Sequence, residues 1–258
     1  MADLQIVQFT ARSDNFAVLV HDPDSGRTAS IDAPEAAPIL AELKDRGWQL
    51  TDIFVTHKHY DHIDGIPALK EAYDVTVTGP AKSARETGLY DETVSDGDSF
   101  DFAGHRVQVI ETPGHTLDHV SYYIADQNLL FSADTLFALG CGRVFEGNPA
   151  MMWNSLKALR ALPDETIVYC GHEYTLANAR FAVTADPQNS QLAQRLAEIE
   201  TLRAAGKPTL PTLLGLEKAT NPFLRADDPA VAAAMGLPAP ILSMCLPRCA
   251  AERTISSA

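Results

Sequence analysis

The sequence predicts an α+β protein in which a strand-rich body is followed by a smaller helical region. Up to residue 173, short apolar runs alternate with turn-forming residues, a pattern typical of strands. Beyond that point such runs almost disappear, and residues 176–183 and 190–205 have the composition and spacing of helices. We therefore predict two domains, residues 1–175 and 176–258, in a chain of 258 residues that is long enough for both.

Turn signals and helical spacing divide the first domain into its elements. Residues 22–26, with the sequence D-P-D-S-G, separate two apolar runs and predict a tight turn. Apolar residues recur at helical spacing in 35–48, where Gly47 stands near the end, and residues 151–162 are also predicted to be helical. The strands expected in chain order are residues 4–9, 16–21, 28–31, 49–56, 75–78, 107–111, 119–125, 129–133 and 166–170.

Composition excludes several classes of function. The formal net charge is −14, so a nucleic-acid backbone, which requires clustered basic residues, is not expected as a partner. The four cysteines, Cys141, Cys170, Cys245 and Cys249, form no C-x-x-C pair, and we expect no disulfide framework and an inert, buried thiol at Cys170. We find no signal-peptide pattern and no apolar run of membrane-spanning length, and we expect a cytoplasmic protein.

The strongest chemical signal is the stretch of residues 56–65, T-H-K-H-Y-D-H-I-D-G, which follows an apolar strand. His57 and His59 are two residues apart, and in an extended segment they point the same way and can share one partner. Asp61 and His62 project towards a second point nearby. Imidazole and carboxylate ligands favour Zn, Fe(II) or Mn(II) over Ca or Mg, so the stretch predicts a metal site.

Three further candidate ligands follow other predicted strands, namely His115, Asp134 and His172. Side chains at the ends of several strands converge at one edge of a sheet, which is how open sheets build sites. Seven ligands are too many for one ion, whereas two ions that share a carboxylate fit, and two-metal sites activate water for hydrolysis. The other histidines are expected outside the ligand set, with His21 exposed, His105 lacking a partner motif and His119 in a supporting role.

The H-x-H-x-D-H motif resembles that of the metallo-β-lactamase superfamily, which includes hydrolases, nucleases and oxygenases. The resemblance implies a four-layer αββα sandwich. It also implies a first metal on His57, His59 and His115 and a second on Asp61, His62 and His172. Asp134 would bridge the two ions, and the motif by itself does not specify a reaction.

Four other segments resemble glyoxalase II, the hydroxyacylglutathione hydrolases: residues 13–16 (S-D-N-F), 141–147 (C-G-R-V-F-E-G), 171–175 (G-H-E-Y-T) and 221–225 (N-P-F-L-R). This resemblance implies hydrolysis of S-D-lactoylglutathione to D-lactate and glutathione, as in methylglyoxal detoxification, by a monomer with two divalent ions, zinc foremost and iron or manganese as alternatives. Asp61 and Asp134 would be the catalytic carboxylates, while Arg143 and Tyr174 would bind glutathione beside a C-terminal helical domain.

Three alternatives stay open at this point. A lactonase would use the same seven ligands, and a persulfide dioxygenase would use a single iron with fewer ligands. A metal-binding module without turnover would need an occluded site. The segments around Arg143 and Tyr174 favour the thioester hydrolase.

The C-terminal tail departs from the glyoxalase II pattern, which ends in a basic run of the type R-R-K-D-x-F. Residues 241–258 have no such run. Codons can be chosen for them that, read in a shifted frame, encode P-L-D-V-L-A-E-V-R-R-R-K-D-D-F-I-S. We therefore expect a frameshift close to residue 240, with weakened glutathione binding as its consequence.

Overall fold

The computed structural model describes residues 3–236, so the atypical tail from residue 241 lies outside the described residues. The chain forms two compact units. Unit 1 comprises Met1–Glu111 and Thr116–Ser132, and unit 2 comprises Thr112–His115 and Ala133–Ala258. These units reflect packing and do not test the division at residue 175, which stays a prediction.

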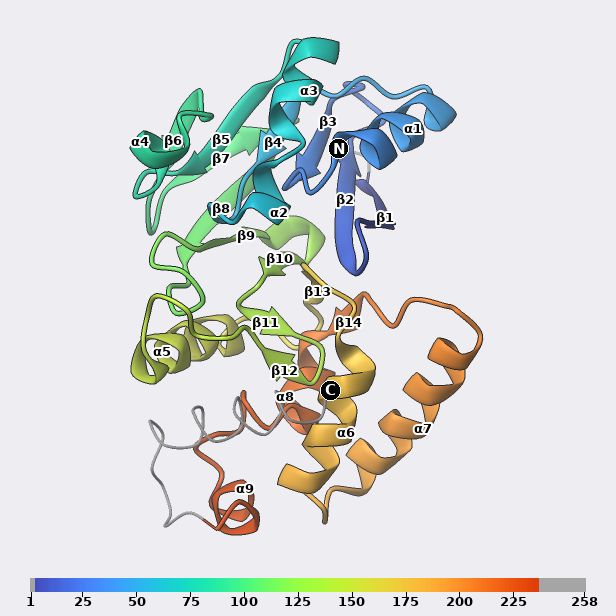
Figure 1. Ribbon diagram of the computed structural model, residues 1–258, viewed down its shortest axis with the longest axis vertical. Helices are drawn as coiled ribbons and strands as arrows, with labels where there is room; N and C mark the ends of the chain where they lie inside the picture. The colour runs from blue at the N-terminus through green and yellow to red at the C-terminus, as the bar shows by residue number, and fades with distance from the viewer. Residues whose placement is uncertain (1–2, 237–258) are drawn as a thin grey trace. The chain divides into compact units, whose positions relative to one another are not determined.

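A six-stranded sheet organises unit 1 and explains where the histidine-rich stretch begins (Figure 1). Its strands, in spatial and chain order, are β1 (Gln5–Ala11), β2 (Asn15–His21), β3 (Thr28–Ile31), β4 (Asp52–Phe54), β5 (Thr76–Pro80) and β6 (Glu92–Val94). The first three are antiparallel, whereas β3 to β6 run parallel to one another. The carboxyl ends of β3 and β4 therefore lie at the same edge, and the chain leaves β4 there towards His57.

Helices cover one face of this sheet. They are α1 (Ala36–Arg46) and α3 (Ile66–Ala72), with the short helices α2 (Tyr60–Ile63) and α4 (Ala84–Thr87) elsewhere in the unit. Ile39 and Leu43 of α1 are fully buried in one cluster with Ile53 of the sheet. Gly47 ends α1 in the left-handed conformation, as the helix-stop signal predicted.

A second group of strands packs on the first sheet through aromatic side chains. These strands are β7 (Ser99–Phe102), β8 (His105–Glu111), β9 (Val120–Ile124) and β10 (Leu129–Ala133), neighbours in that order. Phe54 of β4 contacts Phe102 and Tyr122 with ring centroids 5.6 and 5.8 Å apart. The two layers thus share a core within unit 1. The predicted hairpin across residues 126–128 is confirmed, with Asn128 in the left-handed region.

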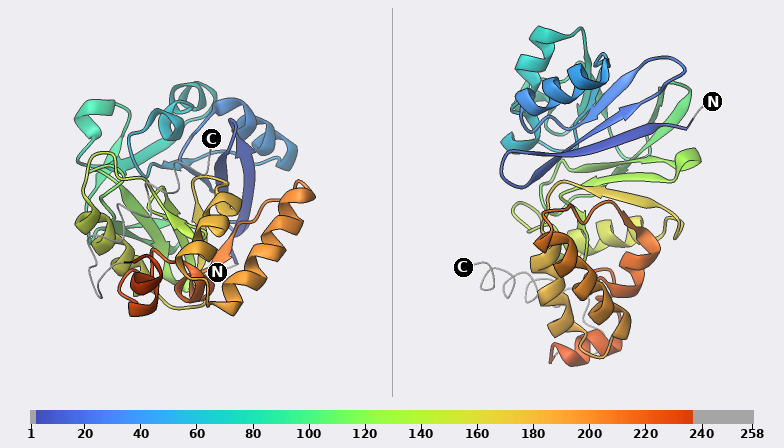
Figure 2. Two further views of the ribbon diagram at one scale, coloured as in Figure 1. Left: turned by 60° about the horizontal axis from the view of Figure 1, so that its bottom comes forward. Right: turned by 90° about the vertical axis from the view of Figure 1, so that its right-hand side faces the viewer.

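Unit 2 combines a small hairpin, one strand pair and most of the helices. Its elements are β11 (Leu136–Phe137), β12 (Gly140–Cys141), α5 (Pro149–Arg160), β13 (Ile167–Cys170), α6 (Thr175–Ala185), α7 (Ser190–Ala204), β14 (Thr212–Leu213), α8 (Leu214–Thr220) and α9 (Pro229–Ala234). Helices α6 and α7 lie side by side (Figure 2). Ala179, Ala182 and Leu192 form their shared core together with Leu139 of the hairpin.

The predicted elements are confirmed with small shifts at their ends, and the α+β class with a helical C-terminal region is confirmed as well. One strand is shorter than expected, because residues 49–56 were predicted and only Asp52–Phe54 are in β4. The backbone N–H of Thr56 donates to the side chain of Asp32 and not to a neighbouring strand. No helix in the described part of the chain is long and apolar enough to cross a membrane.

Candidate metal centre

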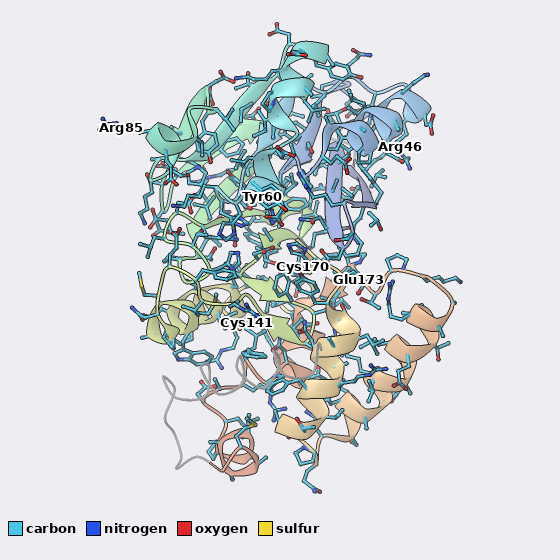
Figure 3. The ribbon with its side chains drawn as sticks, in the orientation of Figure 1. Arg46, Tyr60, Arg85, Cys141, Cys170 and Glu173 are labelled. Carbon is cyan, nitrogen blue, oxygen red and sulfur yellow. The ribbon has the colours of Figure 1, made fainter. Side chains whose placement is uncertain are left out.

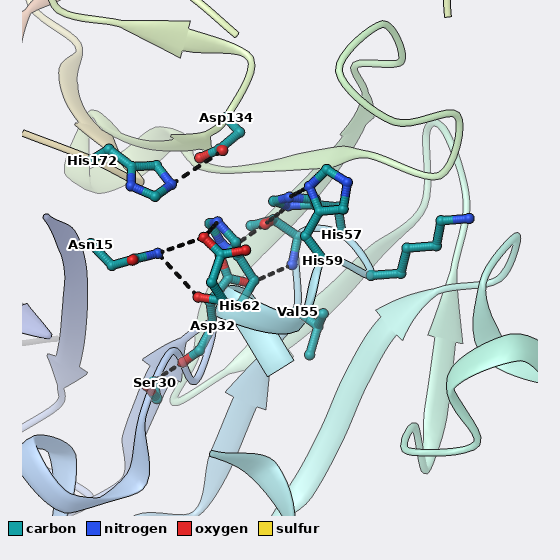
Figure 4. Close-up of polar contacts among 12 residues, drawn as sticks. Asn15, Ser30, Asp32, Val55, His57, His59, His62, Asp134 and His172 are labelled. Carbon is teal, nitrogen blue, oxygen red and sulfur yellow. Dashed lines mark hydrogen bonds and ion pairs between the residues drawn. The ribbon is translucent and has the colours of Figure 1, made fainter. Parts of the chain in front are cut away.

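In unit 1 the four predicted ligands of the histidine-rich stretch lie on an extended segment and the short helix after it. His57 and His59 are in the extended segment, and Asp61 and His62 are on α2. His57 Nε2 lies 3.1 Å from His59 Nδ1 (Figure 4). Two ligand atoms about 2.0–2.1 Å from a tetrahedral zinc are about 3.3 Å apart, so this spacing fits two ligands of one ion.

Asp32, which the sequence analysis did not single out, supports two of these histidines. It follows β3 with φ at +57° and is 4% exposed. Its Oδ1 accepts from Thr56 N at 2.7 Å, and its Oδ2 accepts from Thr56 Oγ1 at 2.8 Å. Oδ2 also lies 2.7 Å from His62 Nδ1. Both residues are labelled in Figure 4. A carboxylate on Nδ1 fixes the tautomer in which Nε2 offers its lone pair to a metal.

The same carboxylate acts on His57 through Thr56. The Thr56 hydroxyl donates to Asp32 and lies 3.0 Å from His57 Nδ1, so this oxygen accepts from the imidazole. The Nε2 side of His57 then carries the lone pair, on the side where His59 approaches. One buried aspartate therefore sets the orientation of two predicted ligands.

Asn15 is a second residue whose role the sequence analysis missed. It begins β2 and is 3% exposed. Its Nδ2 donates to the backbone oxygen of Asp61 at 3.1 Å and to Asp61 Oδ2 at 3.0 Å. The amide thus holds the carboxylate of Asp61 in one orientation at the start of α2, and Asp61 Oδ2 lies 3.7 Å from His62 Nε2.

The loop after His115 supports the histidine-rich stretch from another direction. The ring of His119 stacks on that of His57, with centroids 4.8 Å apart and planes 25° apart. Asp118 Oδ2 accepts from Lys58 N at 3.0 Å. Both residues hold the segment that carries His57 and His59, and the predicted supporting role of His119 agrees with this position.

In unit 2 the three remaining predicted ligands come together. His115 lies beyond β8, Asp134 directly follows β10, and His172 follows β13; each is 5% exposed. Asp134 Oδ2 lies 3.4 Å from His115 Nε2 and 3.3 Å from His172 Nε2. Both separations match that expected for neighbouring ligands of a tetrahedral ion, about 3.3 Å for bonds of the usual length. A single carboxylate oxygen therefore faces two imidazoles.

The two predicted substrate-binding residues lie next to these ligands in unit 2. Tyr174 is 37% exposed, and its ring stacks on His172 with centroids 4.8 Å apart. The backbone oxygen of Arg143 lies 2.8 Å from His115 Nδ1, which leaves Nε2 on the side of Asp134. The Arg143 guanidinium lies over the exposed ring of Phe145 at 5.6 Å. A cation and a phenol are thus present on the surface beside the ligands.

Two histidines outside the ligand set are structural, and one expectation about them is wrong. His21 was expected to be exposed, yet it is 8% exposed and stacks on Trp48 at 4.1 Å. Burial lowers the pKa of His21, and its Nδ1 lies 2.9 Å from Thr28 Oγ1. His105 is buried at the start of β8, where Nδ1 pairs with Asp126 at 2.5 Å.

The thiol of Cys170, labelled in Figure 3, lies at the end of β13, two residues before His172. The residue is 3% exposed, and burial raises the pKa of the thiol well above its usual range. A protonated thiol is a poor nucleophile and a poor metal ligand. The predicted burial of Cys170 is confirmed, and its expected inertness stays a prediction.

The donor chemistry of both units fits a divalent metal. In unit 1, ligand atoms of Asp32, His57 and His62 lie within 4.8 Å of one another. In unit 2, the carboxylate of Asp134 faces two imidazoles. Buried imidazole and carboxylate donors whose other ring nitrogens are held by hydrogen bonds are typical of Zn, Fe and Mn sites.

Comparison with known proteins places the chain in a family. Residues 11–172 match the metallo-beta-lactamase superfamily profile, and residues 173–245 match the profile of the hydroxyacylglutathione hydrolase C-terminus. The hydroxyacylglutathione hydrolase of Rhizobium meliloti is 58% identical over 237 residues, which cover 92% of this chain and 93% of that protein.

Solved structures show the same fold. The crystal structure of ETHE1 from Myxococcus xanthus has a TM-score of 0.66 at 27% identity and covers 99% of this chain and 100% of its own. The crystal structure of TTHA1623 in a di-iron-bound form has a TM-score of 0.59 at 26% identity, and the match covers 85% of this chain and 99% of that chain. The metallo-β-lactamase fold implied by the H-x-H-x-D-H motif is confirmed.

Proposed function

Since this chain belongs to the hydroxyacylglutathione hydrolases of the metallo-β-lactamase superfamily, we propose that it hydrolyses S-D-lactoylglutathione to D-lactate and glutathione. The observation that carries the proposal is the 58% identity to a hydroxyacylglutathione hydrolase along 93% of that protein's length. The reaction belongs to methylglyoxal detoxification. The cytoplasmic location and the monomeric state expected from the sequence stay predictions.

The seven predicted ligands hold two divalent ions in this proposal, zinc foremost. His57, His59 and His115 would hold one ion, Asp61, His62 and His172 would hold the other, and Asp134 would be shared. Support for the shared role comes from Asp134 Oδ2, which lies 3.4 and 3.3 Å from the two imidazoles of unit 2. The di-iron-bound form of TTHA1623 supports a pair of ions in this fold. Bound ions of this kind supply Lewis-acid polarisation of the carbonyl and activation of water.

The protein's own residues orient the ligands and bind the substrate. Asp32 and Asn15 hold the ligands of unit 1 in fixed orientations. Arg143 and Tyr174 bind the glutathione part through charge and a hydroxyl group. The leaving group is a thiolate with a pKa of about 8.5, so the reaction requires no strong general acid. We assign the metal ligands, together with Arg143 and Tyr174, to residues 1–175 and further substrate contacts to the helices beyond, and the meeting of the two family profiles at residues 172 and 173 supports a division there.

Metal analysis combined with a thiol-release assay tests the proposal. We expect two ions per chain and the release of one free thiol for each S-D-lactoylglutathione consumed. A lactonase would open lactones and release no thiol from this substrate. A chain with one iron that consumes oxygen in the presence of a persulfide would instead be a dioxygenase, and either result would contradict the proposal.

Replacing Arg143 with alanine is expected to raise KM for S-D-lactoylglutathione by about ten-fold and to change kcat much less. One hydrogen bond to a charged group is worth about 1.5–3 kcal/mol, and about 1.4 kcal/mol is ten-fold in binding. The loss of contacts made equally in ground and transition states raises KM alone. Steady-state kinetics measure both constants. An equal effect on a simple thioester without the glutathione carboxylates would show that Arg143 does not bind that part.

The tail offers a separate prediction about affinity. Residues 241–258 contain only two basic side chains, Arg248 and Arg253. We propose that the shifted-frame sequence, with its R-R-R-K run, is the ancestral tail. A chain that carries it is expected to have a KM at least about ten-fold lower, since one additional hydrogen bond to a charged group of the substrate is worth that much. An unchanged KM would show that the tail contributes nothing to recognition, and resequencing the locus tests the frameshift itself.

A further inference from the structure

The hairpin of β11 and β12 has a two-residue turn, Ala138–Leu139, whose backbone is held by side chains from two helices. Asn221 Nδ2 donates to Phe137 O at 3.1 Å and to Gly140 O at 3.0 Å. Asn178 Nδ2 of α6 donates to Ala138 O at 3.0 Å. Leu139 has a φ of +57°, costly for a branched side chain, and its N–H donates to Glu217 Oε2 at 2.7 Å. A conformation of this kind persists only when its surroundings impose it.

Behind the turn lies a buried ion pair between Glu217 of α8 and Arg195 of α7. Glu217 is 0% exposed and Arg195 is 6% exposed, and the guanidinium donates to Glu217 Oε1. Thr212 Oγ1 donates to the same oxygen at 2.9 Å, and Arg195 also donates to Thr220 Oγ1 at 2.7 Å. Both oxygens of Glu217 are therefore fully used, one by Arg195 and Thr212 and the other by Leu139 and Asn221. A buried ion pair contributes little net stability, and its best-attested use is to fix one arrangement.

This hairpin connects to every predicted site residue of unit 2. Asp134 precedes β11, and the ring of Phe137 lies 6.1 Å from His172 and 5.5 Å from Tyr174. Beyond β12, Gly142 N donates to Thr135 O at 3.1 Å. A Cβ on Gly142 would lie 1.8 Å from Asp134 O, so the two backbones touch. Arg143 comes next, and its backbone oxygen holds His115.

The two arms of the hairpin differ in how they are anchored. The segment that leads into β11 has its own support. Gly171 N donates to Ala133 O at 3.1 Å, and Thr135 Oγ1 donates to Thr112 O at 3.0 Å. The turn that leads into β12 is held by other residues. Leu139 N donates to Glu217, and Asn221 donates to the backbone oxygen of Gly140. Disturbing Glu217 should therefore displace the segment that leads to Arg143 more than it displaces Asp134.

We propose that Glu217, held by Arg195, is a positioning residue that fixes the turn at Leu139 and so places Arg143 for binding the glutathione carboxylates. The inference rests on the proposed function, in which Arg143 binds glutathione. It assigns to the buried Arg195–Glu217 pair a role in substrate affinity. Specificity for glutathione then depends on a residue that never touches the substrate.

The variant Glu217→Gln tests this role. If the amide oxygen faces Arg195, the amide nitrogen opposes the N–H groups of Leu139 and Asn221, two donors that Oε2 now accepts. We expect KM for S-D-lactoylglutathione and the dissociation constant for glutathione, measured by calorimetry, to rise by about ten-fold, on the scale of one lost charged contact. Metal content and kcat should fall less than glutathione affinity, because Asp134 keeps its own anchors although His115 is held by the Arg143 backbone oxygen. A thioester without the carboxylates should show no change in KM.

Lys218→Met is the matched control on the same helix. Lys218 bonds to Leu162 O at 2.7 Å and to Asp164 at 2.5 Å, both of which lie outside the hairpin, so its loss should leave both constants unchanged. If Glu217→Gln does not fold, Asn178→Ala removes the bond to Ala138 O and should give a smaller shift in the same direction.

A double-mutant cycle decides between positioning and general destabilisation. In a chain that already carries Arg143→Ala, Glu217→Gln should add little to KM, because coupled residues are not additive. The proposal would be overturned if the two substitutions raised KM independently, so that their fold-changes multiplied in the double variant. A fall in kcat and metal content without a change in glutathione affinity would also overturn it. If the parent binds glutathione but releases no thiol, the proposed hydrolysis fails, while the calorimetric comparison still tests the positioning role.

Discussion

Replacing Asp134 with alanine is expected to reduce hydrolysis by on the order of 10³-fold or more, the scale of losing a preorganised electrostatic group. Its Oδ2 lies 3.4 Å from His115 Nε2 and 3.3 Å from His172 Nε2, and we assign it as the shared ligand of both ions. Metal content should therefore fall at both positions. Elemental analysis of the purified variant, alongside thiol release, measures both effects.

The control for this prediction is His105→Gln. Like several of the candidate ligands, His105 is a buried histidine beside a carboxylate, here that of Asp126. It lies at the start of β8, whereas His115 lies beyond the other end of that strand. Metal content should match that of the parent. Two tightly held ions in Asp134→Ala would refute the shared assignment, and a loss of metal in His105→Gln would show that the assay reports folding and not ligation.

Most of the fold was predictable because the strands and helices carry their own signals. The strands β1 to β5 of the first sheet were located, and the turn residues marked where they end. The strands β6 (Glu92–Val94) and β7 (Ser99–Phe102) were missed, because they are short and largely exposed. Such strands form because a neighbouring strand pairs with them, and their own sequences carry little pattern.

The candidate site was predictable to the extent that residue type reveals chemistry. Clustered histidines and strand-end aspartates indicated the seven candidate ligands without any structure. The residues that support them were missed, since an isolated polar residue gives no spacing signal. Asp32, Asn15 and Glu217 reach partners 24, 46 and 78 residues away in the chain. Asp32 offered a clue, as a charged residue directly after a strand parallel to the one that leads to His57. Asn15 lies in the S-D-N-F segment that resembles the family, but that segment did not indicate its contact with Asp61.

The support from Asp32 gives the second large effect. In Asp32→Asn the amide can still accept from Thr56 N, but its NH₂ group opposes the donors on Thr56 Oγ1 and His62 Nδ1. Both imidazoles that depend on this carboxylate lose their fixed orientation. Residues that orient metal ligands are worth about 10–100-fold in metal affinity or activity, and we expect a loss at the upper end of this range.

Competition with a chromophoric chelator measures this loss directly, without turnover. The metal affinity of Asp32→Asn should fall while far-ultraviolet circular dichroism stays that of the parent, and activity should return as metal is added in excess. Asp52→Asn is a suitable comparison, because Asp52 is also a buried aspartate of the same sheet, and it pairs with Arg27 at 2.7 Å at the amino end of β4. If Asp32→Asn binds metal as tightly as Asp52→Asn, the orientation of His57 and His62 does not depend on Asp32. The support would then come from Thr56 and the stacked ring of His119, which contact His57 from other sides.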